Sequence, residues 1–445
     1  MPINSIHPEY TANFVRWTRS RDTYEGSDTV KAKGKMYLPA LSGQTAVEYS
    51  SYRDRALYYG ATARTLAGLV GSVLRRPPLI KVPEGMAHLL EDVTNTGVSI
   101  NQFMKIMLQE VLLTGRYSVL VDRAEDGGRP YLVGYQTESF VNWWDNTKVL
   151  LETVLEPAED DPYEFSPVDI YRELVLTDEG YSVNVWSQTD KSAEWSIIKS
   201  YTPSNRGLQI DNIPFFTVTP DGVTEDISRP PLLDLIDVNL SHYRSSADLE
   251  HGRHFTALPT PWVSGVDPNE TELKIGSSSA WVLPDAGSKA GFLEFTGQGL
   301  TALENALKHK EQMMAILSAR LFEKDSKVVE SAHTAKIRHS SEASILTNIA
   351  QSVETGMIKI LKTVAIWEGF DPDEVSVEVN KDYLDDVLDH QGLNAIIQAY
   401  QQGVISLDTL LYNMKKGELL PPDTTIEEEK AKLPTERVLE GTINE

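Results

Sequence analysis

The sequence predicts an α+β fold, because helical and strand-forming patterns occupy separate stretches of the 445-residue chain. Apolar residues recur every three to four positions in residues 45–76, in 99–114 and again after 231, as they do in amphipathic helices. Residues 117–201 instead hold short runs rich in β-branched and aromatic residues, separated by turn sequences. We therefore expect an antiparallel meander flanked by helices.

The N-terminal region is expected to hold an arm and one helix. Residues 1–40 are polar and of mixed charge, and we interpret them as an arm that carries a cluster of three lysines, Lys31, Lys33 and Lys35. The periodic stretch 45–76 is expected to be a single helix. Pro77 and Pro78 end it, because proline lacks the N–H that a helix interior needs.

A second helix is predicted from Ser99 to Thr114, followed directly by strands. Ser99 is a suitable N-cap, and Gly115 is suited to the left-handed C-cap position. Asp126-Gly127-Gly128 is a turn sequence and predicts a hairpin between the first two strands. The runs expected as strands are 117–123, 131–136, 149–155, 170–177, 181–187 and 195–201.

The second half of the chain is predicted to be mostly helical. Pro230 and Pro231 mark a boundary, after which a helix is expected to about Phe255. A small β-element, a helix from about 299 to 323, a polar segment and a long helix from about 332 to 367 should follow. Further expected elements are a strand at 374–380, two helices within 391–416 broken at Gly403 with Ser406 as N-cap, and an acidic tail from Pro421.

Composition excludes several classes of protein. The chain has no cysteine, which excludes disulfide scaffolds, thiolate nucleophiles and iron–sulfur clusters. Its formal net charge of −24 argues against a groove that grips nucleic acid through many phosphate contacts. The N-terminus lacks an apolar stretch of signal-peptide length, so we expect a soluble, non-secreted protein without a membrane segment.

Motifs for catalysis are absent from the sequence. It has no phosphate-binding G-x-x-x-x-G-K-[ST] loop, no HExxH and no G-x-S-x-G. The densest carboxylate cluster, Asp382, Asp385, Asp386 and Asp389, has the spacing of one helical face, which is compatible with a two-metal phosphohydrolase site or with a solvated acidic surface. We favour the second interpretation and predict no enzyme activity, no catalytic residue, no metal site and no cofactor.

The order of several segments resembles the portal proteins of tailed bacteriophages, the ring proteins through which DNA enters and leaves the capsid. The resemblance covers residues 1–380. It is carried by HPEYTANFVRWTRSRDTYEG (7–26), SYRDRALYYGATARTLAGLVGSVLRRPP (51–78), QTESFVNWW (136–144), IPFFTV (213–218) and RPPLLDLIDVNLSHYRSSADLEHG (229–252).

The resemblance implies a portal fold with an α/β wing, a two-helix stem, a small β-containing clip, a long kinked helix and a helical crown. Gly356 is the candidate bend in the long helix. The implied parts are the wing at 1–230 (arm included), the first stem helix at 231–256, the clip at 257–298, the second stem helix at 299–323, the tunnel loop at 324–335, the long helix with its return to the wing at 336–380, and the crown with its acidic tail at 381–445.

The resemblance also implies site residues. In the tunnel loop the expected contacts to DNA are Lys324, Ser326, Lys327, Glu330 and His333, although a plain surface loop is the alternative. In the clip the expected partner contacts are Trp262, Asp267, Glu270 and Trp281; for the two tryptophans, local packing is the alternative.

The function implied is a ring of about twelve subunits at one capsid vertex of a virion, assembled in the host cytoplasm. It would be the channel for DNA packaging and ejection, with double-stranded DNA passing through without sequence specificity. Its partners would be terminase, scaffolding and major capsid proteins, and head-completion or tail adaptor proteins. The alternatives are another head–tail connector component and the acidic metal-dependent phosphohydrolase.

Overall fold

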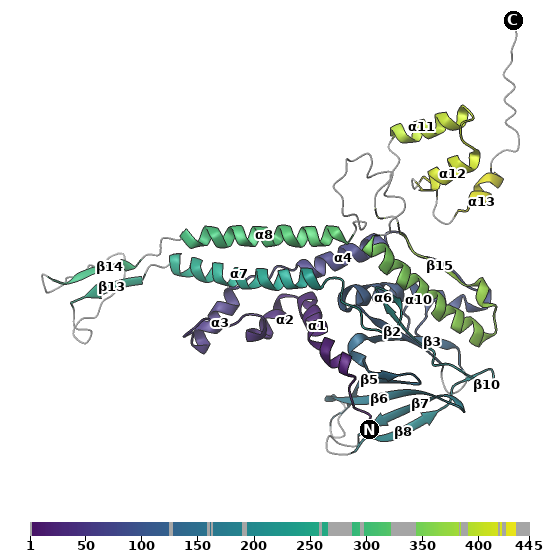
Figure 1. Cartoon of the computed structure of the whole chain (residues 1–445), viewed down its shortest axis with the longest axis horizontal. Coiled ribbons are helices and arrows are strands. Elements are labelled where there is room, and N and C mark those ends of the chain that lie inside the picture. Colours follow the sequence, from purple (N-terminus) through teal and green to yellow (C-terminus); the bar gives the residue numbers. More distant parts are fainter. Residues whose placement is uncertain are drawn as a thin grey trace, which may run out of the picture. The chain divides into compact units, whose positions relative to one another are not determined.

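Helices and antiparallel sheets make up the computed structural model, which confirms the predicted α+β class (Figure 1). The structure describes residues 2–123, 128–157, 161, 163–188, 194–257, 260–265, 287–293, 298–321, 344–381, 383, 390–416, 419–420 and 424–432. The chain divides into two units, Met1–Lys381 and Asp382–Glu445.

The N-terminal segment is helical and packed, so the prediction of an arm was wrong. Helices α1 (Pro8–Glu25) and α2 (Ser27–Ala32) follow one another, and α1 contacts α6 and α7. Trp17 is fully buried and Tyr10 is 7% exposed. The polar composition concealed this, because only one narrow side of α1 is apolar.

The single helix expected over 45–76 is two helices, α3 (Ala46–Arg55) and α4 (Ala61–Val73). Ala56 adopts an extended conformation with ψ 136° and ends α3. Contacts with other helices stabilise the non-helical residues between α3 and α4. The Leu57 amide donates to Ser246 Oγ of α7 at 3.1 Å, and the Tyr58 hydroxyl donates to the Thr23 carbonyl of α1 at 2.7 Å. These partners are far away in sequence, so periodicity alone did not reveal the break.

Helix α6 (Ile100–Thr114) begins and ends as predicted. Ser99 Oγ accepts from the Gln102 amide at 3.3 Å, and Gly115 has a left-handed φ of 82°. A four-stranded sheet of order β12-β11-β2-β3 lies beside it. Its strands are β2 (Tyr117–Arg123), β3 (Pro130–Gln136), β11 (Phe215–Thr219) and β12 (Gly222–Val223), and the first two form the predicted hairpin.

A separate five-stranded antiparallel sheet of order β4-β5-β6-β7-β8 confirms the meander for 149–201, whereas the strands at 117–123 and 131–136, expected in the same meander, lie with β11 in the four-stranded sheet instead. Its face toward α1 contributes Val141 and Val149 to a core with Tyr10 and Trp17. Its other face contributes Arg172, which pairs with Asp122 of β2. The strands are β4 (Phe140–Trp144), β5 (Thr147–Pro157), β6 (Phe165–Thr177), β7 (Gly180–Ser187) and β8 (Ser196–Tyr201).

Two long helices run side by side, joined through a small β-hairpin at one end (Figure 1). The first is α7 (Leu233–Ala257) and the second is α8 (Gln298–Arg320). Between them along the chain, β13 (Thr260–Ser264) pairs antiparallel with β14 (Lys289–Leu293). The helices predicted at 231–256 and 299–323 therefore correspond to α7 and α8.

Helix α10 (Ile345–Glu368) is the described part of the predicted long helix; residues 336–343 lie outside the described residues. It runs without interruption through Gly356, the candidate bend. That glycine lies against β11, where a Cβ atom would be 2.4 Å from Val218 Cγ2. Strand β15 (Ser376–Glu378) is the predicted returning strand and pairs with β1 (Leu79–Lys81).

The second unit contains α11 (His390–Gln401), α12 (Leu407–Lys416) and α13 (Ile426–Lys432). Gly403 has a φ of 72°, and Ser406 Oγ accepts from the Thr409 amide at 3.2 Å, so the predicted break and N-cap are both confirmed. The remaining short elements all belong to the first unit: α5 (His88–Glu91), β9 (Ser204–Asn205), β10 (Leu208–Gln209), η1 (Gly34–Met36), η2 (Glu84–Met86), η3 (Thr137–Ser139) and η4 (Pro372–Glu374).

Candidate functional site

The helix pair α7–α8 is held together by polar contacts along its length. Near the middle, Lys310 Nζ donates to the Ser241 carbonyl at 3.0 Å and to Ser245 Oγ at 2.5 Å. Burial lowers the pKa of Lys310, and the nearby Arg244 lowers it further. Nearer the hairpin, Arg253 of α7 pairs with Glu304 of α8 at 2.8 Å.

Apolar contacts bring the two helices close. Met314 of α8 is 2% exposed and forms a core cluster with Leu235 of α7 and Ala61 of α4. Further along, Gly252 allows a close approach, because a Cβ atom there would lie 2.7 Å from Leu300 Cδ2. The two helices therefore pack directly on each other, and we call the contact surface between them the seam.

His242 is a titratable group buried in that seam. Its Nε2 lies 3.4 Å from Glu311 Oε1, its Nδ1 is buried without a hydrogen-bond partner, and the Tyr59 ring lies against it with centroids 5.4 Å apart. Burial lowers the pKa of His242 despite the opposing effect of Glu311. The neutral ring is therefore favoured.

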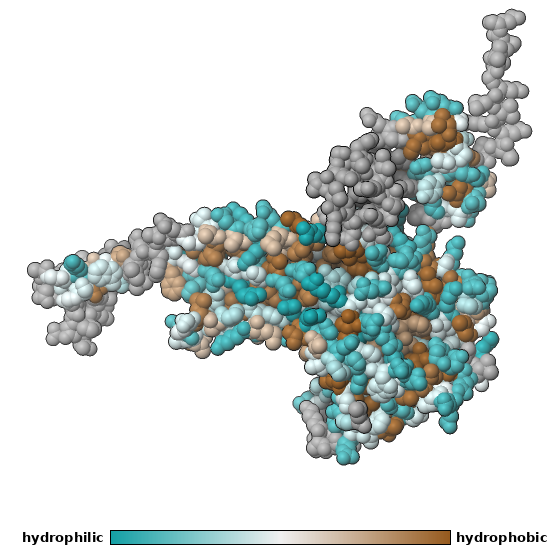
Figure 2. All heavy atoms as spheres, viewed as in Figure 1, coloured by the Kyte–Doolittle hydropathy of each residue, from teal (hydrophilic) through white to brown (hydrophobic). Residues whose placement is uncertain are grey.

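Helix α8 has a second strip of apolar side chains that is exposed in the structure. Met314 and Leu317 of the first strip pack with Leu235 and Val238 of α7, and Leu303 and Leu307 continue that strip by helical spacing. The second strip, with the same alternating three- and four-residue spacing, holds the apolar residues Ala302, Ala306, Met313 and Ile316, with the polar His309 between them and Arg320 at its end. Met313 is 38% exposed and Ile316 is 53% exposed. Two such strips on one helix are typical of a helix with two neighbours. In Figure 2 brown hydrophobic residues accordingly lie among teal ones along the helix pair.

The β13–β14 hairpin carries an aromatic residue on each face. Trp262 pairs with Gly291 across the strands, and the indole covers that glycine so closely that a Cβ would lie 3.2 Å from Nε1. Phe292 pairs with Pro261, points to the opposite face and is 58% exposed. Trp262 itself is 42% exposed. An isolated two-stranded hairpin is only marginally stable in water, so this tip is suited to contact with a partner.

Most of the predicted site residues lie outside the described part of the chain. This holds for all five tunnel-loop residues, Lys324, Ser326, Lys327, Glu330 and His333, and for the clip residues Asp267, Glu270 and Trp281. Of the acidic cluster, Asp382, Asp385, Asp386 and Asp389 also lie outside it. Trp262 is the predicted site residue that the structure places.

The two ends of the segment that holds the tunnel-loop residues lie together. The Leu346 amide donates to the Leu321 carbonyl at 3.0 Å, and Leu321 is buried. Ser344 caps α10, its Oγ accepting from the Thr347 amide at 3.1 Å. The described chain thus stops at Leu321, after α8, and resumes at Ser344, before α10, with these two ends hydrogen-bonded to each other through Leu321 and Leu346.

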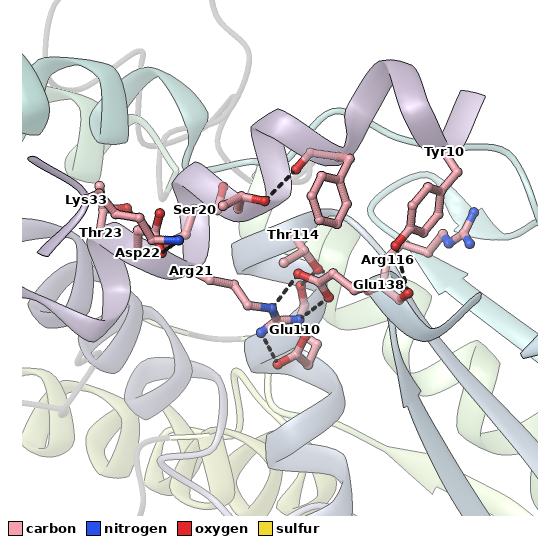
Figure 3. A network of polar contacts seen from close by, with 12 residues as sticks. Tyr10, Ser20, Arg21, Asp22, Thr23, Lys33, Glu110, Thr114, Arg116 and Glu138 are labelled. Atoms are coloured by element: carbon pink, nitrogen blue, oxygen red, sulfur yellow. Dashed lines mark hydrogen bonds and ion pairs between the residues drawn. The ribbon is translucent and has the colours of Figure 1, made fainter. Parts of the chain in front are cut away.

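An ion-pair network, not foreseen from the sequence, ties α1 to the body (Figure 3). Arg21 donates to both carboxylate oxygens of Glu110 on α6, at 3.0 and 2.7 Å, and to both of Glu138 in η3, at 2.6 and 2.8 Å. Burial alone would lower the pKa of Arg21, but the hydrogen bonds to Glu138 and Glu110 outweigh it and raise that pKa. The Tyr10 hydroxyl donates to the Glu138 carbonyl at 2.9 Å.

The same helix is also fixed by Asp22, which binds the residue after η1, and by Arg19, which binds α7. Asp22 accepts from the Tyr37 hydroxyl at 2.5 Å, and Arg19 pairs with Asp237 of α7 at 3.1 Å. The arginines in the sequence RWTRSRD follow one another at two- and three-residue steps. The repeated arginines indicate a helix that forms ion pairs, but their spacing does not show that Arg19 and Arg21 pair with Asp237, Glu110 and Glu138.

Arg116, at the start of β2, is buried without a carboxylate partner. Its guanidinium carbon lies 4.4 Å from the Phe140 ring centroid and 4.7 Å from that of Trp143, and Nη2 donates to the Phe140 carbonyl at 3.1 Å. Burial lowers its pKa to about 10. Its Nε and Nη1 have no partner. The aromatic rings are therefore its main stabilising contacts.

The described residues hold neither a metal-binding cluster nor a membrane-spanning helix. They contain no group of three or more histidine, aspartate or glutamate side chains arranged to hold a metal ion. Among the same residues, no helix is both long and apolar enough to cross a membrane.

Comparison with known families and curated proteins gave one match. Residues 231–368 match a family described as "Domain of unknown function (DUF4055)". This range begins just before α7 and ends at the last residue of α10, so it takes in the helix pair, the hairpin and α10. No curated protein matches the chain.

Comparison with solved structures gave distant likenesses at 12% identity. One is a chain of the virion of a native gene transfer agent particle, with 84% of this chain and 94% of that chain covered and a TM-score of 0.39. Another belongs to the neck of the native particle computed with C12 symmetry, with 78% and 87% covered and a TM-score of 0.36. A third is an HK97 family phage portal protein from Corynebacterium diphtheriae, with 72% and 92% covered and a TM-score of 0.29.

Proposed function

We propose that the protein is a portal protein: a non-enzymatic ring at one capsid vertex of a phage-like particle, through which double-stranded DNA is packaged and ejected. In this proposal α7 and α8 are the stem, the β13–β14 hairpin belongs to the clip, residues 1–230 form the wing and the second unit is the crown. The ring would have about twelve subunits.

The second apolar strip of α8 carries the proposal. A helix of 23 residues is about 35 Å long, and this one packs on α7 with one strip while leaving Met313 and Ile316 exposed on the other. In a closed ring each copy has a neighbour on both sides. A neighbouring stem would cover the second strip, and its alanines near the hairpin end would let two helices approach closely.

DNA would pass through the channel without being gripped. A net charge of −24 per copy makes the ring acidic, and an acidic wall avoids the tight, salt-dependent binding that basic grooves give. The loop that touches DNA would be the segment between Leu321 and Ser344, and its contact residues would be Lys324, Ser326, Lys327, Glu330 and His333.

The proposed partners follow from the position of such a ring. The clip, with Trp262, Asp267, Glu270 and Trp281, would contact terminase during packaging and the head-completion or tail adaptor proteins afterwards. Exposed Phe292 fits this role, because aromatic residues often anchor interfaces. Scaffolding and major capsid proteins would contact the wing, and the assembled protein would be located in the virion.

Substitutions on α8 test the proposal. We expect Met313→Asp combined with Ile316→Asp to abolish ring formation, because two charges would be buried between neighbouring stems. Gln312→Asp is the matched control: it adds a charge to the same helix turn but on the polar flank, and it should assemble as the wild type does. Assembly is measured by mass photometry, and folding by thermal unfolding.

The two results have separate meanings. Loss of rings in the double variant, with an unchanged unfolding temperature of the subunit, supports the stem assignment. Normal rings in the double variant would show that the second strip does not lie between subunits and would remove the main support for the proposal.

A further inference from the structure

One end of the five-stranded sheet exposes large apolar side chains on the face toward α1. On that face, Leu151 and Tyr171 pack against the core cluster that contains Tyr10 and Val149. Further along the same strands, Leu155 is 65% exposed and Phe165 is 56% exposed. The first half of the face is therefore part of the core, and the second half is not.

Strand register places these exposed residues together. Leu151 pairs with Tyr171, and alternate residues of β5 and β6 then bring Leu155 and Phe165 to the same face. Tyr171 pairs with Trp186 of β7, which pairs with Ile197 of β8, so Ile197 lies level with the packed half of the face and outside the exposed end. We call the patch of Leu155 and Phe165 the sheet end.

The sheet end is surrounded by negative charge. The described residues of 153–169 and 194–201 contain one basic side chain, Lys199, and the acidic side chains Glu156, Asp161, Glu164, Asp169 and Glu194. Of these, Asp169 is placed by the register on the same face as Leu155. A partner for this patch should therefore be apolar at its centre and basic around it.

The segment of residues 31–49, from the end of α2 through η1 to the first turn of α3, has that character. It exposes three apolar side chains, Met36 at 66%, Leu41 at 40% and Val47 at 77%. Residues 31–49 contain the lysines Lys31, Lys33 and Lys35 and one acidic side chain, Glu48. We call this segment the basic ledge.

We infer that the sheet end of one copy docks onto the basic ledge of the next copy in the ring. The inference rests on the proposed ring and adds a contact outside the stem. The apolar side chains of both patches are exposed in the same chain, so the chain covers neither apolar centre by itself. Of the ledge lysines, Lys33 pairs with Asp22 within the chain. Acidic side chains surround the sheet end and lysines surround the basic ledge, so the charges around the two apolar centres are complementary.

A contact between two different patches is head-to-tail, and head-to-tail contacts generate rings when the rotation closes. Each copy then uses its sheet end toward one neighbour and its ledge toward the other. Attraction between unlike charges would favour this head-to-tail contact over contacts between two sheet ends or between two ledges, which bring like charges together.

Charge reversal tests the contact in the full-length protein. The ledge variant carries Lys31→Glu and Lys35→Glu, and the sheet variant carries Glu164→Lys and Asp169→Lys. We expect each to raise the protein concentration at half-maximal ring formation about tenfold, and the variant with all four changes to return close to the wild-type value. The matched control, Glu374→Lys with Glu378→Lys, reverses two exposed acidic residues outside both patches and should assemble normally.

The outcomes separate this inference from the proposed function. If the wild type forms rings and each reversal assembles normally, or if the fourfold variant does not recover, the docking of sheet end on ledge is wrong while the ring stands. If the wild type forms no ring, the inference and the proposed function fail together. Thermal unfolding of the subunits confirms that each variant is folded.

Discussion

Arg21 shows how a single side chain fixes the N-terminal helix. It binds two carboxylates, Glu110 and Glu138, and the side chains of all three are at most 24% exposed. Without the guanidinium, two partly buried negative charges would face each other unpaired, which is more costly than losing an exposed ion pair. The contact lies between residues that are 89 and 117 positions apart.

We predict that Arg21→Met lowers the free energy of unfolding by about 2 kcal/mol. Arg16→Met is the matched control on the same helix: Arg16 is exposed and donates to Asn13 within its own helix, so its loss should change the free energy by less than about 0.5 kcal/mol. Urea unfolding followed by circular dichroism measures both. Equal losses in the two variants would contradict the role of the network.

His242 makes stability depend on pH. Its pKa is lowered by burial in the folded protein, so the unfolded chain binds a proton first as the pH falls below about 7. The free energy of unfolding should therefore decrease as the pH falls through the ordinary pKa of 6.5 toward the folded value. The charged groups that face the ring, Glu311 and Lys310, come from α8 and act in opposite directions.

We predict a shallower loss of stability between pH 7.5 and 6.0 in His242→Gln, since glutamine keeps a donor toward Glu311 but does not titrate. His254→Gln, which replaces a partly exposed histidine of the same helix α7, should keep the wild-type slope. Thermal unfolding in a pH series measures the slopes. A wild-type slope in His242→Gln would mean that another group dominates this range.

Features of the helices that depend on neighbouring residues could be predicted from the sequence, whereas features that depend on distant residues could not. The caps at Ser99, Gly115 and Ser406 depend on the local chain, and the structure confirms all three. The break between α3 and α4 depends on Ser246 and Thr23, which are distant in sequence, and was missed. The second strip of α8 is visible as spacing alone, but only the packing on α7 shows which strip is left uncovered.

Gly356 is explained by the packing of α10 on β11. We predict that Gly356→Ala lowers the free energy of unfolding by about 1–3 kcal/mol, because the new methyl group would overlap Val218. Gly71→Ala, at an exposed position of α4 with no atom within 4 Å of the new Cβ, should raise it by about 0.5–1 kcal/mol. Denaturant unfolding measures both signs.

A second substitution checks the cause. Val218→Ala should recover part of the loss in the Gly356→Ala background, because it removes the overlapping methyl groups. If the two losses simply add, the contact between Gly356 and Val218 is not the reason for the glycine.

At the scale of the whole molecule, the account depends on surfaces that one copy leaves unused. The second strip of α8, the hairpin with Trp262 and Phe292, and the sheet end each expose large apolar side chains. Large exposed apolar patches usually mark interaction sites. Residue patterns predicted the elements that carry these patches, but the patches themselves required the tertiary structure, because exposure is a property of the packed chain.

The molar mass of the purified protein tests the central claim most directly. Light scattering after gel filtration, with electron micrographs of the same peak, should give a species of about twelve subunits with a central hole. A monomer or dimer over the whole accessible concentration range, with and without scaffolding protein, would contradict the account, because the second strip of α8 would then remain exposed to water.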